Sequence, residues 1–580
     1  MHPEACRYRR RRPFLALSSS LCLVLSAFAG LVTTGELLAA EPQVRDRQEA
    51  ALTGPDPALR AFAYGSFQEM KGDHWGAIET FRKISPAAPV DAAAVEYSIS
   101  KAFSSLSVAD SARVHGESAV SLDPGNIHYA RHAARLAHGM QDYQRAAELY
   151  GQAAGAAPDR TDLLYSQGLE YVAAGRPSEA LEVFEKLLKR DPLDEKAISQ
   201  TLWLQITLKR YPEAIVTLNQ LAGVVGNSQK LQLTLGQLYD LTGNGEKAVD
   251  TFKGIIAEER NAVPAWVALF DQRIRMGNHD DLLREYLEFD SLTPRDAGRS
   301  VEVARLFAAR SERDSLYLRP VTLMLDELTL RYSRDARIPL LRGAFQMIHQ
   351  KYGDAVSAFN RALLLEHRDV DAWEGLSMAY LELQDKRMLF RTIARAKQAI
   401  PRQRDRLAVL EGYALLHTGS PSRAARILEM AVGREAGSLN EELLIKANTS
   451  LAMAYDRLGR RQLSGKAYAR VLELDPHNVL AMNNLAYLYA EAGIRLQQAL
   501  RLARNAVLLE PDNGVYLDTL GWVLCRLGNY DAARDMLEKA VATGIGESEI
   551  FTHLGMVYQK LGDAEKAGEM FDKAKSVKMK

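Results

Sequence analysis

Residues 161–194 read TDLLYSQGLEYVAAGRPSEALEVFEKLLKRDPLD, a stretch of 34 residues in which small, aromatic and turn-forming residues hold fixed places. Counted from its first residue, position 8 is Gly168 and position 20 is Ala180. Position 24 is Phe184, and position 32 is Pro192. Apolar residues recur every three or four positions, which is typical of amphipathic helices. The stretch therefore predicts two helices with a turn between them and a proline after the second.

The same spacing recurs from about residue 58 to the end of the chain. We expect positions 8 and 20 to be small because the two helices of a unit cross there. We expect the ring at position 24 to fill the space between units, where its burial contributes roughly 1.5–3 kcal/mol. Position 8 is glycine at Gly65, Gly168, Gly236, Gly343, Gly412, Gly521 and Gly555. Position 20 is alanine at Ala77, Ala146, Ala180, Ala214, Ala248, Ala355, Ala424, Ala533 and Ala567.

This pattern resembles the tetratricopeptide repeat (TPR). The resemblance implies an all-α, right-handed superhelical solenoid of about 14–15 helix-turn-helix repeats, which brings no chemistry of its own and favours binding over catalysis. It predicts an N-terminal array of about seven repeats over residues 58–296, a degenerate repeat over 297–335, and a C-terminal array of about seven over 336–580. Units begin near Ala58, Ala93, Ile127, Thr161, Glu195, Gln229, Val263, Ala336, Val370, Asp405, Ile445, Val479, Gly514 and Ser548.

The first 40 residues predict export. Five arginines within residues 7–12 precede an uncharged stretch over 14–32, and small residues at 27–29 or 38–40 fit a cleavage site. Residues 1–40 are therefore either a signal peptide or an N-terminal membrane anchor, and residues 41–57 a polar lead-in. Either alternative places the repeats across the membrane, in the periplasm or at the outer membrane. The Arg11-Arg12 pair leaves twin-arginine export open beside the general route.

Composition excludes several classes of function. The chain has 73 basic and 73 acidic residues, and without residues 1–40 it has 68 and 71, so no concentrated basic face for nucleic acid is expected. Cys525 is alone beyond the leader, so no internal disulfide can form, and we expect a packed or groove-facing thiol. No phosphate loop, nucleophile elbow or His-Glu-x-x-His motif occurs. We predict no enzyme, no cofactor and no metal.

Three histidines form the only cluster that suggests a metal. His128 and His132 lie one helical turn apart, and His138 follows. A metal site needs a third or fourth ligand with ordered support, so we interpret these histidines as a solvated helix face.

The surface lining the solenoid is the expected binding site, because in this family it comes mainly from the first helix of each unit. Position 9 should face inward, and in the last six units it forms a column of soft and aromatic side chains, which is typical of a peptide-binding groove. The column comprises Met378, Tyr413, Met453, Tyr487, Trp522 and Met556, with polar neighbours at positions 5 and 13 that include Asn483, Asp518 and Arg526. A second interpretation stays open, in which these residues are simply core.

The function that follows is a non-enzymatic exported scaffold that binds protein partners through the concave C-terminal groove. By resemblance to large exported TPR proteins, its setting is exopolysaccharide export or the assembly of envelope and secretion complexes. Two alternatives stay open: a glycan-binding protein that stacks sugars on Trp522 and Tyr487, and a supporting subunit of an envelope glycosyltransferase or peptidase. The last helix, with apolar residues from Ala567 to Ala574 and no capping helix after it, suggests a homo-oligomer through the C-terminal end.

Overall fold

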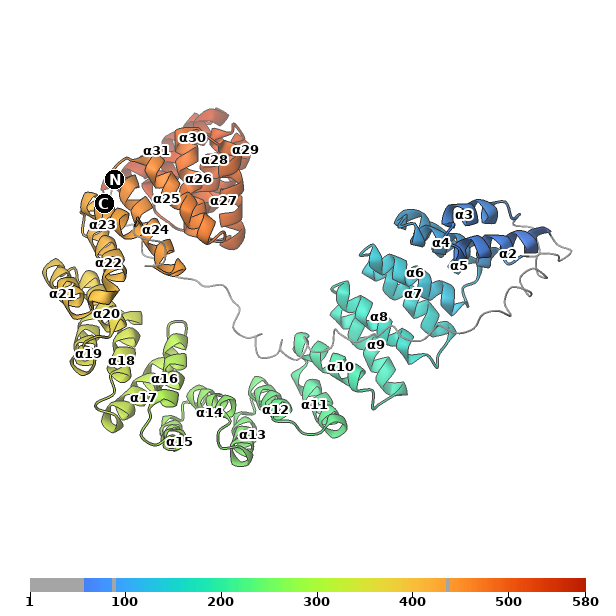
Figure 1. The fold of residues 1–580 in the computed structure, drawn as a ribbon, viewed down its shortest axis with the longest axis horizontal. Helices are drawn as coiled ribbons and strands as arrows, with labels where there is room; N and C mark the ends of the chain where they lie inside the picture. Colours follow the sequence, from blue (N-terminus) through green and yellow to red (C-terminus); the bar gives the residue numbers. More distant parts are fainter. Residues whose placement is uncertain (1–56, 86–89, 434–438, 580) are drawn as a thin grey trace. The chain divides into compact units, whose positions relative to one another are not determined.

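The computed structural model describes residues 57–85, 90–433 and 439–579. Within these ranges every regular element is a helix, and no strand occurs. The α-helices α2 to α31 follow one another as fifteen helix-turn-helix pairs (Figure 1). This confirms the predicted all-α solenoid of about 14–15 repeats. The predicted signal peptide or anchor, residues 1–40, and residues 41–56 of the lead-in lie outside the described residues.

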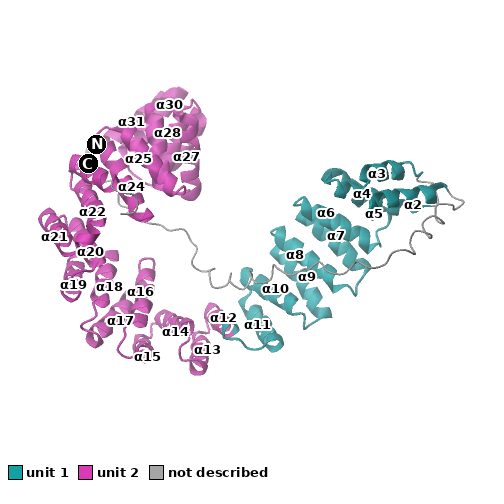
Figure 2. Ribbon diagram, viewed as in Figure 1, with its two compact units in different colours: residues 1–231 teal, residues 232–580 magenta. Residues whose placement is uncertain are grey.

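The chain divides into two compact units, residues 1–231 and 232–580, with the boundary inside α12 (Gln229–Leu241) (Figure 2). The first unit contains α2 (Pro57–Met70), α3 (His74–Arg82), α4 (Ala92–Ser105), α5 (Ala109–Leu122), α6 (Ile127–Gly139), α7 (Tyr143–Ala156), α8 (Thr161–Ala173), α9 (Pro177–Arg190), α10 (Glu195–Thr207) and α11 (Tyr211–Val225).

The second unit continues from α12 to the end of the chain. Its helices are α13 (Gly245–Glu258), α14 (Val263–Arg275), α15 (His279–Ser291), α16 (Gly298–Arg310), α17 (Leu318–Arg331), α18 (Arg337–Ile348), α19 (Tyr352–Leu365), α20 (Val370–Glu382), α21 (Lys386–Ala399), α22 (Arg404–His417), α23 (Pro421–Val432), α24 (Glu441–Arg457), α25 (Arg461–Leu474), α26 (Val479–Ala492), α27 (Leu496–Leu509), α28 (Gly514–Arg526), α29 (Tyr530–Ala542), α30 (Ser548–Leu561) and α31 (Ala564–Met579). Two short 3₁₀ helices, η2 (Ser315–Tyr317) and η3 (Pro401–Gln403), precede α17 and α22.

The glycine at position 8 leaves room for the ring at position 24. A Cβ placed on Gly236 would lie 2.3 Å from the ring of Phe252, and one on Gly343 would lie 2.6 Å from the ring of Phe359. Both distances are shorter than carbon atoms tolerate, so no larger residue fits without moving a buried ring. The ring of Phe359 also lies against Gly375 of the next repeat, as expected for a side chain that fills the space between units. Position 20 is buried at every one of the predicted alanines, and Leu282 and Leu389 are buried at the same place in two other repeats.

The turn at position 15 imposes a second backbone constraint. Position 15 has a positive φ in every one of the fourteen repeats that the sequence marks, at Gly72, Ser107, Gln141, Gly175, Lys209, Gly243, Gly277, Gln350, Gln384, Gly419, Gly459, Gly493, Gly528 and Gly562. The left-handed conformation is therefore a property of the turn, which glycine adopts most easily and other residues adopt at a cost.

The stretch from 297 to 335 departs from this turn. Ser311, at the corresponding place, has a φ of −64°, and the 3₁₀ helix η2 follows it. A buried carboxylate holds this region instead: Asp290 of α15 accepts hydrogen bonds from Ser300 of α16 at 2.7 Å, from Arg331 of α17 at 2.6 Å and from Tyr332 at 3.0 Å. Side-chain hydrogen bonds thus join three helices where the repeat motif is absent.

The first helices of the last repeats contact one another across the repeats, α26 with α28 and α28 with α30, more extensively than the second helices do. In a stack of helix pairs, the helices that approach each other most closely lie on the inner side. The first helices therefore form the inner wall of the C-terminal repeats, which is where the sequence placed the binding surface.

The last helix is less open than the sequence suggested. Ala567, Met570 and Ala574 of α31 are each under 9% exposed, and the first two belong to the same apolar cluster as Leu554 and Val557 of α30. The apolar face that motivated a homo-oligomer through the C-terminal end is therefore covered within the chain. Among the described residues, no helix combines the length and apolar character needed to cross a membrane.

The contact between positions 8 and 24 gives a matched pair of glycine substitutions in one repeat. We expect Gly236→Ala to lower the free energy of unfolding by about 1–3 kcal/mol, because its Cβ would overlap the ring of Phe252. A Cβ on Gly254 of α13 would lie in open space. We expect Gly254→Ala to raise the free energy of unfolding by roughly 0.5–1 kcal/mol, because alanine loses less backbone entropy on folding than glycine. Denaturant unfolding followed by circular dichroism measures both. Equal effects of the two substitutions would contradict the packing argument.

Candidate functional site

The predicted site residues differ widely in exposure. Met556 is 40% exposed and Arg526 is also exposed, whereas Asn483, Asp518 and Trp522 are under 9% exposed. The half-buried members are Met378 of α20, Tyr413 of α22, Met453 of α24 and Tyr487 of α26. Position 9 is thus surface in one repeat and core in another, so neither interpretation of the column holds for all its members. Partner binding by these residues stays a prediction.

Three helices bring the C-terminal members of the column together. Tyr487 and Glu491 lie one helical turn apart on α26, Trp522 lies on α28, and Glu549 and His553 lie one turn apart on α30. These are the first helices of three successive repeats. Together with Asp518 of α28, these residues are here called the inner cluster. The remaining predicted residues Met378, Tyr413 and Met453 belong to earlier repeats, where Met453 packs against the apolar cores beside α24 and Tyr413 lies 4.2 Å from the ring of His417.

Hydrogen bonds between repeats fix the inner cluster. Trp522 Nε1 donates to Glu491 Oε1 at 3.0 Å, which joins α28 to α26. His553 Nδ1 lies 2.9 Å from Asp518 Oδ1, which joins α30 to α28. The Tyr487 hydroxyl donates to Glu549, which joins α26 to α30 across the intervening repeat. Every helix of the inner wall over these three repeats is therefore tied to the other two.

Two neighbours pack against the Trp522 indole. The ring of His553 stacks on it with centroids 4.3 Å apart and planes at 12°, and the Arg526 guanidinium lies 5.6 Å from its centroid. Trp522 is only 8% exposed. A sugar-stacking platform needs an open ring face, so the packing of Trp522 speaks against the glycan-binding alternative.

The inner cluster holds more carboxylates than cations. Burial alone would lower the pKa of His553, but the hydrogen bond and charge of Asp518, with Glu549 and Glu491, raise it above its ordinary value. Burial raises the pKa of Asp518, an effect that His553 opposes. Burial and the charges of Asp518 and Glu549 raise the pKa of Glu547, which precedes α30. Since like charges raise carboxyl pKa values, negative charge accumulates at the start of α30.

Sequence reasoning missed His553 and Glu549. They stand at positions 6 and 2 of the last unit, outside the column at position 9 from which the groove was inferred. A helical wheel of α30 would have found both, because Glu549, His553 and Met556 lie on one stripe at intervals of four and three residues.

Two serine–histidine pairs, one buried and one partly buried, resemble nucleophile–base pairs, but the hydrogen bond between serine and histidine runs in the opposite direction. Ser100 Oγ donates to the carbonyl of Ala112 at 2.6 Å and lies 2.9 Å from His132 Nε2. The hydroxyl proton is therefore used, so His132 must donate to Ser100 rather than accept from it. Ser311 has the same arrangement, since it donates to the carbonyl of Ala308 and lies 2.8 Å from His349 Nε2. Neither serine is activated for attack.

The three histidines of the suspected metal cluster have separate surroundings. His132 is 7% exposed and bonded to Ser100, so its interpretation as a solvated residue was wrong, and burial lowers its pKa to about 4. His128 is exposed, and His138 is paired with Glu170 at 2.9 Å. Throughout the described ranges, no group of three or more ligating side chains is close enough to hold a metal. Cys525 is half-buried beside the C-terminal core, as a packed thiol should be.

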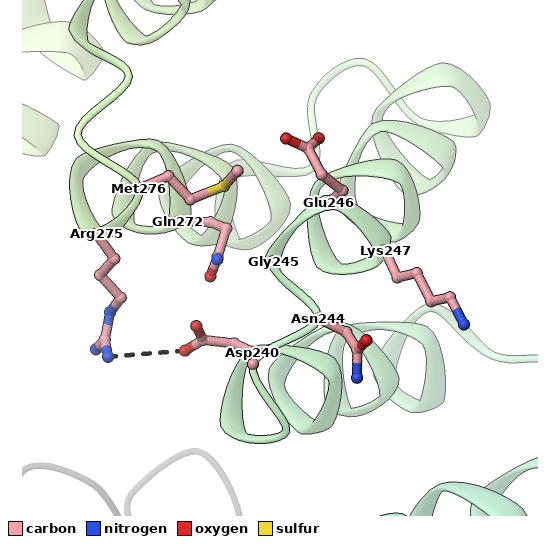
Figure 3. Close-up of a pocket in the computed structure, with 9 residues that line it drawn as sticks. Asp240, Asn244, Gly245, Glu246, Lys247, Gln272, Arg275 and Met276 are labelled. Atoms are coloured by element: carbon pink, nitrogen blue, oxygen red, sulfur yellow. Dashed lines mark ion pairs between the residues drawn. The ribbon is translucent and has the colours of Figure 1, made fainter.

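A shallow hollow of about 580 Å³ lies where the turn between α12 and α13 meets α14 (Figure 3). Arg275 and Asp240 form an ion pair in it at 3.7 Å, and Gln272 and Met276 line the α14 side. Burial alone would lower the pKa of Arg275, but the charges of Asp271 and Asp240 raise it. The hollow has the features of an ordinary surface depression between helices.

The family models that match this chain all describe the same kind of repeat. Three family models, each described as a tetratricopeptide repeat, match residues 126–273, residues 515–544, and residues 445–478 with 548–578. The matched segments lie in both compact units and include the repeats of α28 and α30, two of the three that carry the inner cluster.

Individual relatives are distant and partial. TPR repeat-containing protein PA4667 of Pseudomonas aeruginosa is 26% identical over 161 residues, which is 28% of this chain and 26% of that protein. Human protein O-mannosyl-transferase TMTC1 is 28% identical over 134 residues, 23% of this chain and 15% of that protein. The chain thus spans about a quarter or less of these two curated relatives. Among solved structures, one of Naa15/Naa10 bound to HypK-THB covers 92% of this chain and 96% of its own, at 13% identity and a TM-score of 0.46.

The ion pair of His553 gives a pH-dependent signal at Trp522. Because the pKa of His553 is raised in the folded chain, the pair stabilises the fold fully below the ordinary value of 6.5, and this contribution is lost as the pH rises through the raised pKa. A stacked imidazolium quenches indole fluorescence, so we expect Trp522 emission to increase with a midpoint above pH 6.5.

Asp518→Asn should move this midpoint to lower pH, because the amide keeps the shape of the side chain without its charge. The Trp522 signal is the difference in emission between the unaltered chain and Trp522→Phe across the pH series. A midpoint that is the same with and without Asp518 would contradict the assignment.

Proposed function

We propose that this chain, which belongs to the tetratricopeptide repeat family, is an exported scaffold that gathers protein partners on the inner wall of its C-terminal repeats. Tetratricopeptide solenoids generally bind proteins, so the repeats themselves support an interaction role. The single observation that favours the C-terminal repeats is the inner cluster, where polar and aromatic side chains from three helices meet on one wall.

The inner wall also has an accessible part. Met556 is 40% exposed on the same stripe of α30 as Glu549, which is exposed, and Arg526 is exposed on α28. A flexible thioether beside charged groups adapts to many partner surfaces, because methionine fills irregular gaps at low cost. We therefore propose that Met556 lies within the contact surface and that buried Trp522 supports it from below.

The proposed scaffold is non-enzymatic and acts in the periplasm or at the outer membrane, in exopolysaccharide export or in the assembly of envelope or secretion complexes. Export is supported by the leader in residues 1–40, with its arginines and uncharged stretch. A non-enzymatic role is supported by the direction of the hydrogen bonds in the Ser100–His132 and Ser311–His349 pairs. Each serine donates its proton to a backbone carbonyl, so the histidine does not act on it as a base.

Export is testable with the leader alone. We expect residues 1–57, fused to an alkaline phosphatase that lacks its own leader, to give phosphatase activity in a bacterial host, because that enzyme forms its disulfides only outside the cytoplasm. Val24→Arg with Leu25→Arg should abolish the activity, since each arginine costs about 2.5–3.5 kcal/mol within an inserted segment. An inactive fusion without these substitutions would refute export.

Partner binding is testable with two exposed apolar positions. We expect Met556→Arg to weaken capture of a stoichiometric envelope partner about tenfold or more, because it places a large charge in the contact surface. Leu508→Arg is the matched control, since Leu508 is 78% exposed on α27, a second helix, and should leave capture unchanged. Both chains are compared by quantitative pull-down after circular dichroism has established equal helicity. Equal capture by both variants would place the contact elsewhere.

A further inference from the structure

We propose that the inner wall of α26, α28 and α30 recognises a cationic segment of the partner, with Glu547 and Glu549 receiving the side chain of a lysine or arginine. This inference rests on the proposed function, because it names the chemistry of the partner at the surface proposed there. It requires that the site be negatively charged, reachable, and equipped with acceptors that no lysine or arginine of the chain pairs with.

The carboxylates around the start of α30 outnumber the basic side chains that pair with them. Asp518 is paired with His553, and Glu491 lies 3.0 Å from Trp522 Nε1 and 3.7 Å from Arg461 Nη2. Within the described part of the chain, Glu547 and Glu549 form no ion pair with a lysine or arginine. Glu549 is bonded instead to the neutral hydroxyl of Tyr487. The charges of Asp518 and Glu549 act on Glu547 without a cation to offset them.

Asn483 provides an independent observation. It is 3% exposed, its Nδ2 donates to Asn484 at 3.4 Å, and its Oδ1 has no hydrogen-bond partner. Asn483, Tyr487 and Glu491 lie at intervals of four residues on α26, so Asn483 shares their stripe and lies level with Asp518 of the next repeat. A buried acceptor without a donor costs free energy, which a donor from a ligand would recover.

The acceptors fit a guanidinium or ammonium group. Such a group carries three to five N–H donors and no acceptor, whereas the carboxylates of Glu547 and Glu549 are acceptors without a basic partner. Glu549 is exposed and can be reached first, and the incoming cation would take the place of the Tyr487 hydroxyl on it. The apolar stem of the side chain would then lie along Met556, which is on the same stripe of α30.

The geometry therefore favours a charged contact over a purely apolar one. The tyrosine hydroxyl is neutral, so a guanidinium that takes its place on Glu549 keeps a hydrogen bond to the carboxylate and adds an opposite charge beside it. It also relieves the repulsion among Glu547, Glu549 and Asp518. An anionic segment would meet the opposite conditions and be rejected.

The test uses the full chain and a dye-labelled peptide of repeated Arg-Gly-Ser, with the same peptide carrying glutamate for arginine as the negative probe. We expect fluorescence anisotropy to show binding of the arginine peptide alone, weakening as salt is added. Glu547→Gln with Glu549→Gln should weaken this binding about tenfold or more, because glutamine can still accept from Tyr487 but lacks the charge. The matched control is Glu565→Gln with Glu569→Gln on α31, which removes the same charge from an exposed second helix and should change binding less than twofold.

Equal binding of the arginine peptide by both double variants would overturn the inference, and so would binding of the glutamate peptide. Either result leaves the scaffold proposal standing if Met556→Arg still loses the envelope partner. If instead the envelope partner is retained by Met556→Arg while the arginine peptide distinguishes the double variants, the cation site exists and the proposed function fails. Should the first double variant melt early, Glu547→Gln alone, which breaks no described hydrogen bond, must still weaken binding for the inference to hold.

Discussion

The contact between a glycine at position 8 and a ring at position 24 is the constraint on which this molecule depends. In the repeats that have both residues, it lets the two helices approach until no Cβ fits between them, as at Gly343 and Phe359. The same ring reaches Gly375 of the following repeat, so one side chain sets the spacing within a unit and between units. A repeat stabilised mainly by its neighbours gives an array, and an array places one wall of first helices in line. The inner cluster depends on that array, because its side chains come from the first helices of three successive repeats.

The sequence predicted the parts of the fold that recur locally. The period identified helices, turns and the small buried residues, because packing within a repeat involves residues fewer than 34 positions apart. It did not predict that Ser107 or Gln141 would adopt the left-handed turn, because neither residue favours that conformation by itself. The turn between the two helices of a repeat requires it. The 297–335 stretch was recognisable only as a loss of pattern, since Asp290 gathers its partners from three helices and follows no period.

The site was predictable as a wall but not as a set of contacts. Position 9 correctly brought Tyr487 and Trp522 into one region, yet it could not indicate that Trp522 would be covered by His553 and Arg526. That packing depends on how far each repeat is rotated against the next, which one sequence period does not specify. The bond from Tyr487 to Glu549 joins residues 62 positions apart and skips a repeat. Such a contact can be read only from the stacked helices.

A buried ion pair is weak evidence for stability, because desolvation of the two charges offsets most of their attraction. Asp518 and His553 therefore do not explain why the inner wall is polar when the rest of the repeat packing is apolar. Glu547 and Glu549 do not explain the polar inner wall through stability either, since they repel each other and neither contributes to the core. A surface that keeps such a cost in the free chain gains that free energy back when a cation binds, in addition to any new contact. Specificity then follows from the repulsion itself, because the same carboxylates that attract a lysine or arginine exclude an acidic segment. A scaffold without chemistry of its own can choose among partners in this way.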